Sequence, residues 1–183
     1  YPLGIQSLPA TLVTAVFVGM AFTVQVTKEF TKFGAGDLIG GVVGMAIWRE
    51  LGPLMTGVIV AGRVGAAIAS EIGTMVVTEQ ILALRALSQD IMQYLVIPRV
   101  IACIIMLPLL VGMADIAGFL SGFFISNAVA NVNPSVYFSS AQSMLRIFDI
   151  IGGLMKGVAF GFVIATVSTF IGLRTDHGAK GVG

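Results

Sequence analysis

Six charged side chains interrupt the long apolar stretches of this sequence and are its first candidates for chemistry. Within a bilayer, a charge that is neither paired nor hydrated is strongly unfavourable, so such residues mark binding sites or interhelical ion pairs. Arg49 and Glu50 are adjacent and project about 100° apart on a helix. We therefore expect a polar cavity that accommodates both side chains and lies within reach of Lys156. Interhelical ion pairing is the alternative interpretation of all six: Arg49, Glu50, Arg63, Asp115, Asp149 and Lys156.

The sequence contains no constellation typical of an enzyme. It has one histidine, His177, and one cysteine, Cys103, which excludes an internal disulfide and leaves too few ligands for a zinc site. The phosphate-binding pattern GxxxxGK[ST] is absent, so we expect that this chain does not itself hydrolyse ATP. We therefore predict no catalytic residue, no metal and no cofactor.

Composition indicates an all-α integral membrane protein built as a polytopic helical bundle. Of the 183 residues, 57% are hydrophobic and only 10% are charged, whereas soluble domains carry about 25% charged residues. The net charge is +1 and no basic run occurs, which argues against a nucleic-acid partner. Glycine is abundant, as expected where helices pack closely in lipid.

Four segments are long and apolar enough to span a bilayer, which needs about 20 such residues. The second is too long for one simple span, and Pro53 predicts a kink or break in it, because proline has no N–H to give the carbonyl of Arg49. The polar stretch Ser126–Ser143 is expected as an external loop with room for a short helix. The predicted spans are Leu8–Thr27, Leu38–Ser70, Val100–Phe124 and Ile147–Leu173.

The segment Glu71–Arg99 carries five charges, yet its apolar residues recur at helical spacing. We interpret it as a short amphipathic helix outside the bilayer core, with Thr78 as N-cap and Glu79 in the first turn. Such a helix suits docking on a separate motor protein; lying on the membrane surface is the alternative. The residues that define its apolar face are Ile81, Leu84, Leu87 and Ile91.

Charge in the connecting segments predicts the orientation. The side that holds this amphipathic helix and the tail after Leu173 has more lysine and arginine than the side that holds Lys28 and Lys32. By the positive-inside rule, the amphipathic helix and the tail face the cytoplasm.

Four motifs together resemble the MlaE/YrbE permeases, the membrane subunits of ABC lipid transporters that work with MCE-domain proteins. The longest runs from Arg49 to Leu87, RELGPLMTGVIVAGRVGAAIASEIGTMVVTEQILALRAL. It is followed in the expected order by YLVIPRVIA (Tyr94–Ala102), LMKGVAFG (Leu154–Gly161) and GAKGVG (Gly178–Gly183). The wording of the stretch Phe22–Phe33 and of the last motif is most similar to the cyanobacterial and chloroplast-envelope branch.

The resemblance implies a function and a set of partners. It implies a permease that moves phospholipid or a related glycerolipid between a membrane and an MCE-domain carrier, as a homodimer bound to a cytoplasmic ABC ATPase. It places Arg49, Glu50 and Lys156 at the lipid site, and it implies a bacterial inner membrane or a chloroplast inner envelope. By the same resemblance, the coupling helix that contacts the ATPase includes Thr78, Glu79, Gln80, Ile81, Leu84 and Leu87.

Family members also have an interfacial helix before the first span and a fifth span after GAKGVG. We therefore expect residues 1–183 to form a single permease domain with four of five spans, lacking both of those segments. Two other functions fit the residues alone. One is a secondary transporter with Glu50, Asp115 and Asp149 as proton or ion relays, against which the absence of an internal repeat counts mildly; the other is a non-transporting membrane scaffold.

Overall fold

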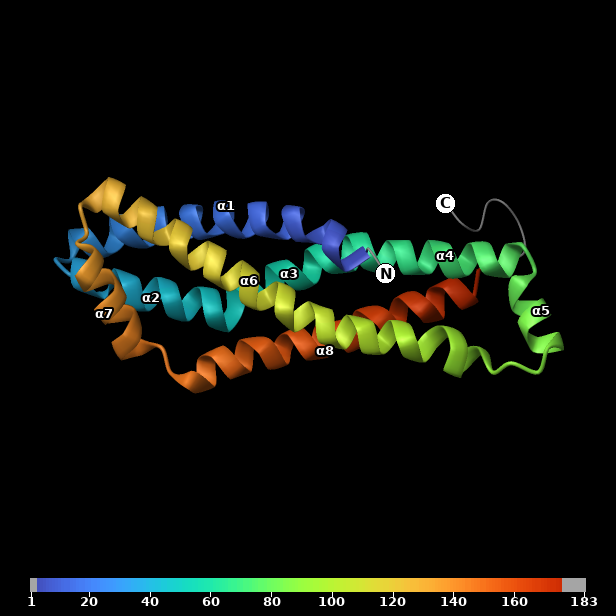
Figure 1. The fold of residues 1–183 in the computed structure, drawn as a ribbon. Helices are drawn as coiled ribbons and strands as arrows, with labels where there is room; N and C mark the ends of the chain where they lie inside the picture. Colours follow the sequence, from blue (N-terminus) through green and yellow to red (C-terminus); the bar gives the residue numbers. More distant parts are fainter. Residues whose placement is uncertain (1–2, 176–183) are drawn as a thin grey trace.

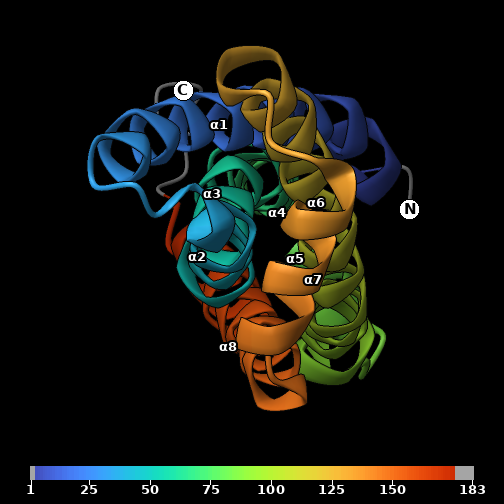
Figure 2. The same ribbon diagram turned by 90° about the vertical axis from the view of Figure 1, so that its left-hand side faces the viewer.

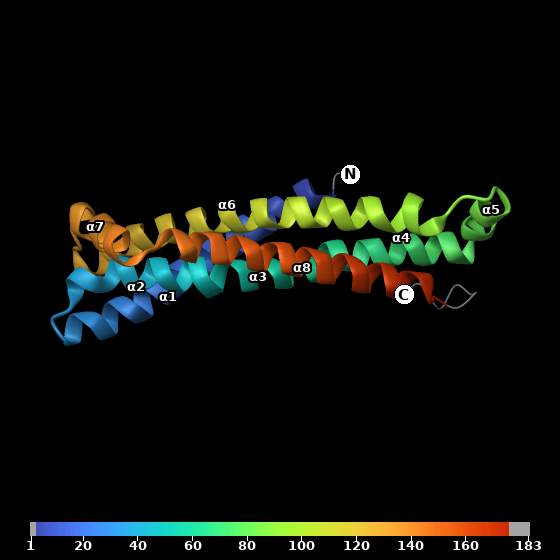
Figure 3. The same cartoon turned by 90° about the horizontal axis from the view of Figure 1, so that it is seen from below.

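The computed structural model describes residues 3–175, and this part of the chain is helical without any strand. Figures 1 and 3 show an elongated bundle with α7 at one end and α5 at the other. The principal helices are α1 (Leu3–Lys32), α2 (Ile39–Ala46), α3 (Gly52–Val60), α4 (Ala66–Val77), α5 (Gln80–Ala86), α6 (Ile97–Ala130), α7 (Pro134–Met144) and α8 (Ile147–Leu173). Short irregular turns join or extend them: η1 (Gly36–Leu38), η2 (Ile47–Leu51), η3 (Ala61–Gly65) and η4 (Met92–Val96).

Four helical segments are long and apolar enough to cross a membrane, which confirms the predicted all-α bundle and its four spans. They are Ser7–Lys32, Gly36–Val77, Met92–Ala130 and Ile147–Leu173. The second has 42 residues, or about 63 Å of helix at about 1.5 Å per residue. That is about twice the 30 Å of a hydrocarbon core, so its ends project beyond the bilayer.

The long helix α6 lies between α1 and α8 and packs against both (Figures 1 and 2). Glycine permits the close approach of α6 to α1 and of α6 to α8. A Cβ at Gly19 of α1 would lie 2.4 Å from the carbonyl oxygen of Gly118, and one at Gly161 of α8 would lie 2.7 Å from that of Cys103. The composition bias toward glycine is therefore a packing requirement of the α6 contacts.

The stretch expected as an external loop is largely helical. Helix α6 continues to Ala130, and α7 begins at Pro134 after Asn133, whose Oδ1 accepts a hydrogen bond from the Ser135 N–H at 3.3 Å. Tyr137 of α7 is fully buried against α2 and α6, and its hydroxyl donates to the carbonyl of Phe119 at 3.3 Å. Burial raises the pKa of this hydroxyl.

Pro53 does not break the second span. A π-helical turn, η2, directly precedes it, and the helix continues into α3 with a bend that is visible between α2 and α3 in Figure 1. The wider π turn accommodates the missing N–H and the proline ring without ending the helix.

The amphipathic segment is shorter than predicted, and the predicted N-cap is wrong. Helix α4 runs on to Val77, and Thr78 ends it, with its Oγ1 donating to the carbonyl of Thr74 at 2.7 Å. The N-cap of α5 is Glu79, which has a left-handed backbone with φ of 59°. Both ends of the predicted non-spanning region, Glu71–Arg99, belong to helices α4 and α6, and an ion pair between Glu71 and Arg99 at 3.2 Å joins them.

Candidate functional site

The η2 turn and the first half of α8 carry the charged residues that the fold brings together. Arg49 and Glu50 lie in η2, while Asp149 and Lys156 lie on α8. The two α8 residues are seven positions apart, so they share one face of the helix. Asp149 is fixed at the start of α8, where its Oδ2 accepts from the backbone N–H of Arg146 at 2.9 Å, a favourable place for an acidic group.

Two interhelical ion pairs join the turn to the helix. The Nε of Arg49 donates to Oδ1 of Asp149 at 2.7 Å, and the Nζ of Lys156 donates to Oε1 of Glu50 at 2.6 Å. The side chains of Arg49 and Glu50 therefore both contact α8, at two different positions along it. On an ideal helix these two side chains would point in different directions. We call these four residues the charge cluster.

Lys156 makes a further contact that depends on Pro53. Because proline has no N–H, the carbonyl of Arg49 lacks its usual intrahelical donor from four residues ahead. The Nζ of Lys156 donates to that carbonyl oxygen at 2.7 Å. One ammonium group thus bonds both to the backbone that proline leaves open and to the carboxylate of Glu50.

The charge cluster lies on the surface of the bundle and not inside a cavity of the single chain. Side-chain exposure is 68% for Glu50, 49% for Arg49 and 43% for Lys156, while Asp149 is 10% exposed. Between the two α8 charges, and on their face, lies Gly152, where a Cβ would meet no atom within 4 Å. The cluster therefore borders open space, and its two positive and two negative groups balance.

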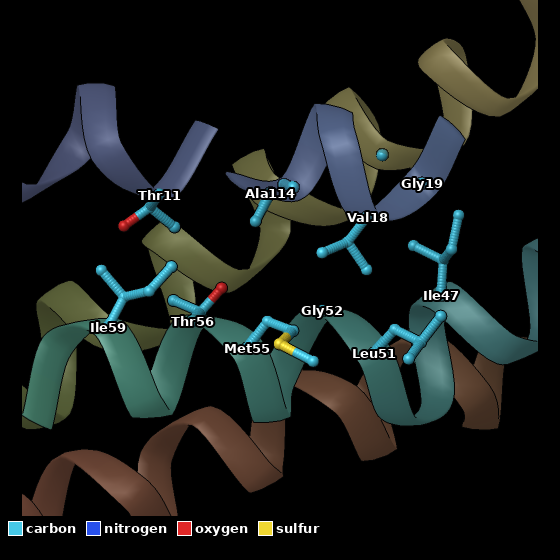
Figure 4. Close-up of a pocket in the computed structure, with 12 residues that line it drawn as sticks. Thr11, Val18, Gly19, Ile47, Leu51, Gly52, Met55, Thr56, Ile59 and Ala114 are labelled. Atoms are coloured by element: carbon cyan, nitrogen blue, oxygen red, sulfur yellow. The ribbon is translucent and has the colours of Figure 1, made fainter. Parts of the chain in front are cut away.

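The opposite face of the same segment borders a different pocket, which Figure 4 shows. It lies between α1, the η2–α3 segment and α6, and its internal volume is about 10 Å³, close to the smallest space that holds one water molecule. Apart from two threonines, its lining is apolar, and no member of the charge cluster contributes to it: Thr11, Ala15, Val18, Gly19, Ile47, Leu51, Gly52, Met55, Thr56, Ile59, Ala114 and Gly118.

The remaining intramembrane charges lie apart from the cluster. Arg63 is exposed in η3, with no ion-pair partner within residues 3–175. Asp115 is buried in α6. Asp149, in contrast, belongs to the cluster, which sequence reasoning did not predict. Its seven-residue spacing from Lys156 was the available signal. The secondary-transport alternative is weakened, because Glu50 and Asp149 are both held in ion pairs.

The predicted coupling residues lie at the other end of the bundle. Thr78, Glu79 and Gln80 are exposed, Ile81 is buried in the protein's own core, Leu84 is half-buried, and Leu87 is 71% exposed. Helix α5 also borders a groove of about 530 Å³, which extends to Asp90 and the start of the third span. Within the described residues, no group of three or more histidine, cysteine, aspartate or glutamate side chains could hold a metal ion.

Comparison with known proteins decides the family. The model of the family described as Permease MlaE matches residues 1–183. This chain belongs to the MlaE permease family. The predicted resemblance is thereby confirmed, although its last motif, GAKGVG, lies outside the described residues.

Several relatives of the MlaE permease domain are similar over nearly its whole length. It is 47% identical over 180 residues to a probable ABC transporter permease of Synechocystis sp., covering 98% of this chain and 68% of that protein. It is 45% identical over 181 residues to a probable ABC transporter permease of Rickettsia typhi, covering 99% and 70%. It is 44% identical over 180 residues to the chloroplastic protein TRIGALACTOSYLDIACYLGLYCEROL 1 of Arabidopsis thaliana, covering 98% and 51%.

The two hydrogen bonds of Lys156, to the Arg49 carbonyl and to the Glu50 carboxylate, predict which of two variants is less stable. Lys156→Met removes the lysine donor from both the Arg49 carbonyl and the Glu50 carboxylate, whereas Glu50→Gln keeps the bond to the carbonyl. An unsatisfied buried or partly buried group costs about 1–3 kcal/mol, so Lys156→Met should unfold at the lower temperature. Thermal unfolding of both variants in lipid nanodiscs measures this. Equal melting temperatures, or the reverse order, would contradict the role of the carbonyl bond.

Proposed function

We propose that this chain forms the membrane-spanning part of an ABC transporter that moves phospholipid or a related glycerolipid between a membrane and an MCE-domain carrier. The observation that carries the proposal is the charge cluster, in which four charged groups gather on a largely apolar transmembrane surface. The names of the relatives from Synechocystis and Rickettsia as ABC transporter permeases support the transporter class.

The charge cluster has the groups that a lipid head group needs. Arg49 uses only its Nε in the bond to Asp149, so its two terminal nitrogens remain available to a phosphate, for which guanidinium is well suited. Glu50 presents its exposed carboxylate beside them. Exposed apolar side chains of α8, including Ile151 and Met155, provide a surface for acyl chains next to the charges.

A second copy of the chain completes this site in the proposal. Charges facing hydrocarbon are unfavourable unless they are hydrated or covered, and this cluster is exposed in one chain. Two copies in a homodimer, with their clusters facing a shared space, would enclose a polar cavity with apolar walls. The lipid would bind there, at Arg49, Glu50 and Lys156.

The energy source in this proposal is a cytoplasmic ABC ATPase docked on α5. The exposed side chain of Leu87 offers an apolar contact, and the groove beside α5 has a mixed lining that includes Leu82, Arg85 and Asp90. ATP binding in the partner would favour one of two packings of the helices, shifting the population between an open and a closed lipid cavity. The membrane would be a bacterial inner membrane or a chloroplast inner envelope, in line with relatives from bacteria and a plastid.

The lipid site predicts a loss of transport without a loss of assembly. Glu50→Ala and Lys156→Ala each remove one head-group contact, so lipid transfer to the carrier should fall at least tenfold while the ATPase remains bound. Transfer of fluorescent phospholipid from proteoliposomes, with ATPase co-purification as the control, measures both. Undiminished transfer in both variants would exclude the cluster as the lipid site.

The docking surface predicts a loss of the ATPase. The double variant Leu84→Asp, Leu87→Asp places two charges on α5 and should release the ATPase in affinity purification of the complex. Phe33→Asp is the matched control, because Phe33 is 83% exposed and directly follows α1, which ends at the other end of the bundle from α5 (Figure 1). If the ATPase stays bound to the α5 variant, the coupling assignment is wrong.

A further inference from the structure

One buried acidic residue of the bundle takes no part in the charge cluster. Asp115, near the middle of α6, has no exposed surface. Neither of its carboxyl oxygens has a hydrogen-bond partner among the described residues, and none of the ion pairs involves it. An uncompensated carboxylate in such a place would be very unfavourable, so its surroundings require explanation.

The carboxyl group of Asp115 packs directly on the backbone of the lipid-site segment. A Cβ built at Gly52 would lie on top of Oδ1 of Asp115, far inside van der Waals contact. Gly52 follows the η2 turn that carries Arg49 and Glu50, and it precedes Pro53. Asp115 and Gly52 thus interlock α6 with the segment that presents the charge cluster.

Among residues 3–175, no positive charge forms an ion pair with Asp115. The α1 residues from Ser7 to Thr27, all of α2, all of α3 and all of α7 contain no lysine, arginine, aspartate or glutamate. The charges of η2 and α8 bond to one another: Arg49 to Asp149, and Lys156 to Glu50. On α6 itself the other charge is Arg99, sixteen residues away and paired with Glu71.

The space beside Asp115 is too small to hydrate a carboxylate fully while the helices stay packed. The pocket beside the contact is lined by Gly52, Ala114 and Thr56, whose Oγ1 is also buried without a hydrogen-bond partner. Its volume of about 10 Å³ admits about one water molecule. A carboxylate, which accepts several hydrogen bonds, is not hydrated in that space unless α3 moves away from α6.

From this geometry we infer that Asp115 is a proton-binding site, and that its bound proton holds the Arg49–Glu50 turn against α6. The neutral acid fits against Gly52, whereas the ionised acid requires hydration and separates α3 from α6 at this point. Loss of the proton is then coupled to a movement of the segment that carries the charge cluster. The inference goes beyond the proposed function, because it does not depend on which lipid, if any, the cluster binds.

The first test measures stability against pH. Asp115→Asn keeps the shape and is permanently neutral, while Asp37→Asn, at an exposed acid of η1, is the matched control. An acid held neutral in the folded protein loses its proton more readily in the unfolded chain, so raising the pH above about 4 favours unfolding of the wild type. The stability of Asp115→Asn should not fall in this way, because asparagine has no proton to lose.

In full-length protein in nanodiscs, we expect Asp115→Asn to melt several degrees above the wild type at pH 8.5 and close to it at pH 5. Asp37→Asn should follow the wild type at both. A difference that does not grow with pH, or a variant that is less stable at pH 8.5, would overturn the inference. Neither outcome involves transport or ATPase binding, so the proposed function would stand.

The second test measures the movement itself. Spin labels at Leu54 of α3 and Met113 of α6, both exposed, are placed in a Cys103→Ser background, and the distance between them is measured by electron paramagnetic resonance. A longer distance should become populated in the wild type at pH 8.5 and remain absent in Asp115→Asn. A wild-type distance that is the same at pH 5 and pH 8.5 would refute the coupling.

Discussion

The structure depends on the way one ammonium group compensates for one proline. Pro53 removes a backbone donor in the middle of a transmembrane helix, where backbone polar groups need partners within the protein or in a polar cavity. Lys156 bonds from α8 to the carbonyl that this leaves open, and it also pairs with Glu50. Together with the Arg49–Asp149 pair, these bonds join α8 to η2 in one register.

The same arrangement explains why the charges remain at the surface. Each positive group is paired, so the cluster is balanced, yet its members remain 43–68% exposed apart from Asp149. Balanced, half-exposed ion pairs exchange partners at a lower cost than buried ones. A head group that brings its own phosphate can therefore replace an internal contact, which is the chemical basis of the proposed lipid site.

Sequence patterns predicted the parts of the fold that depend on local composition. Apolar length set the four spans because a bilayer tolerates few charges, and Pro53 marked the irregular turn. The sequence did not predict where the helices end: α4 continues past Glu71 to Val77, and Glu71 pairs with Arg99, 28 residues away in the sequence. Nor did it predict the pairing of Asp149 with Arg49, which requires the register of α8 against η2, a tertiary property. Thr78 failed as an N-cap because its hydroxyl bonds back to Thr74 within α4.

A glycerolipid in the open space between the two ion pairs would be displaced by a large side chain at position 152. Native mass spectrometry of the full-length complex, purified as wild type and as Gly152→Phe, measures this. Position 152 faces open space, so phenylalanine should leave the assembly intact while it fills the site. We expect bound phospholipid in the wild type and its loss in Gly152→Phe. Equal lipid occupancy in two intact complexes would rule out lipid binding at this site.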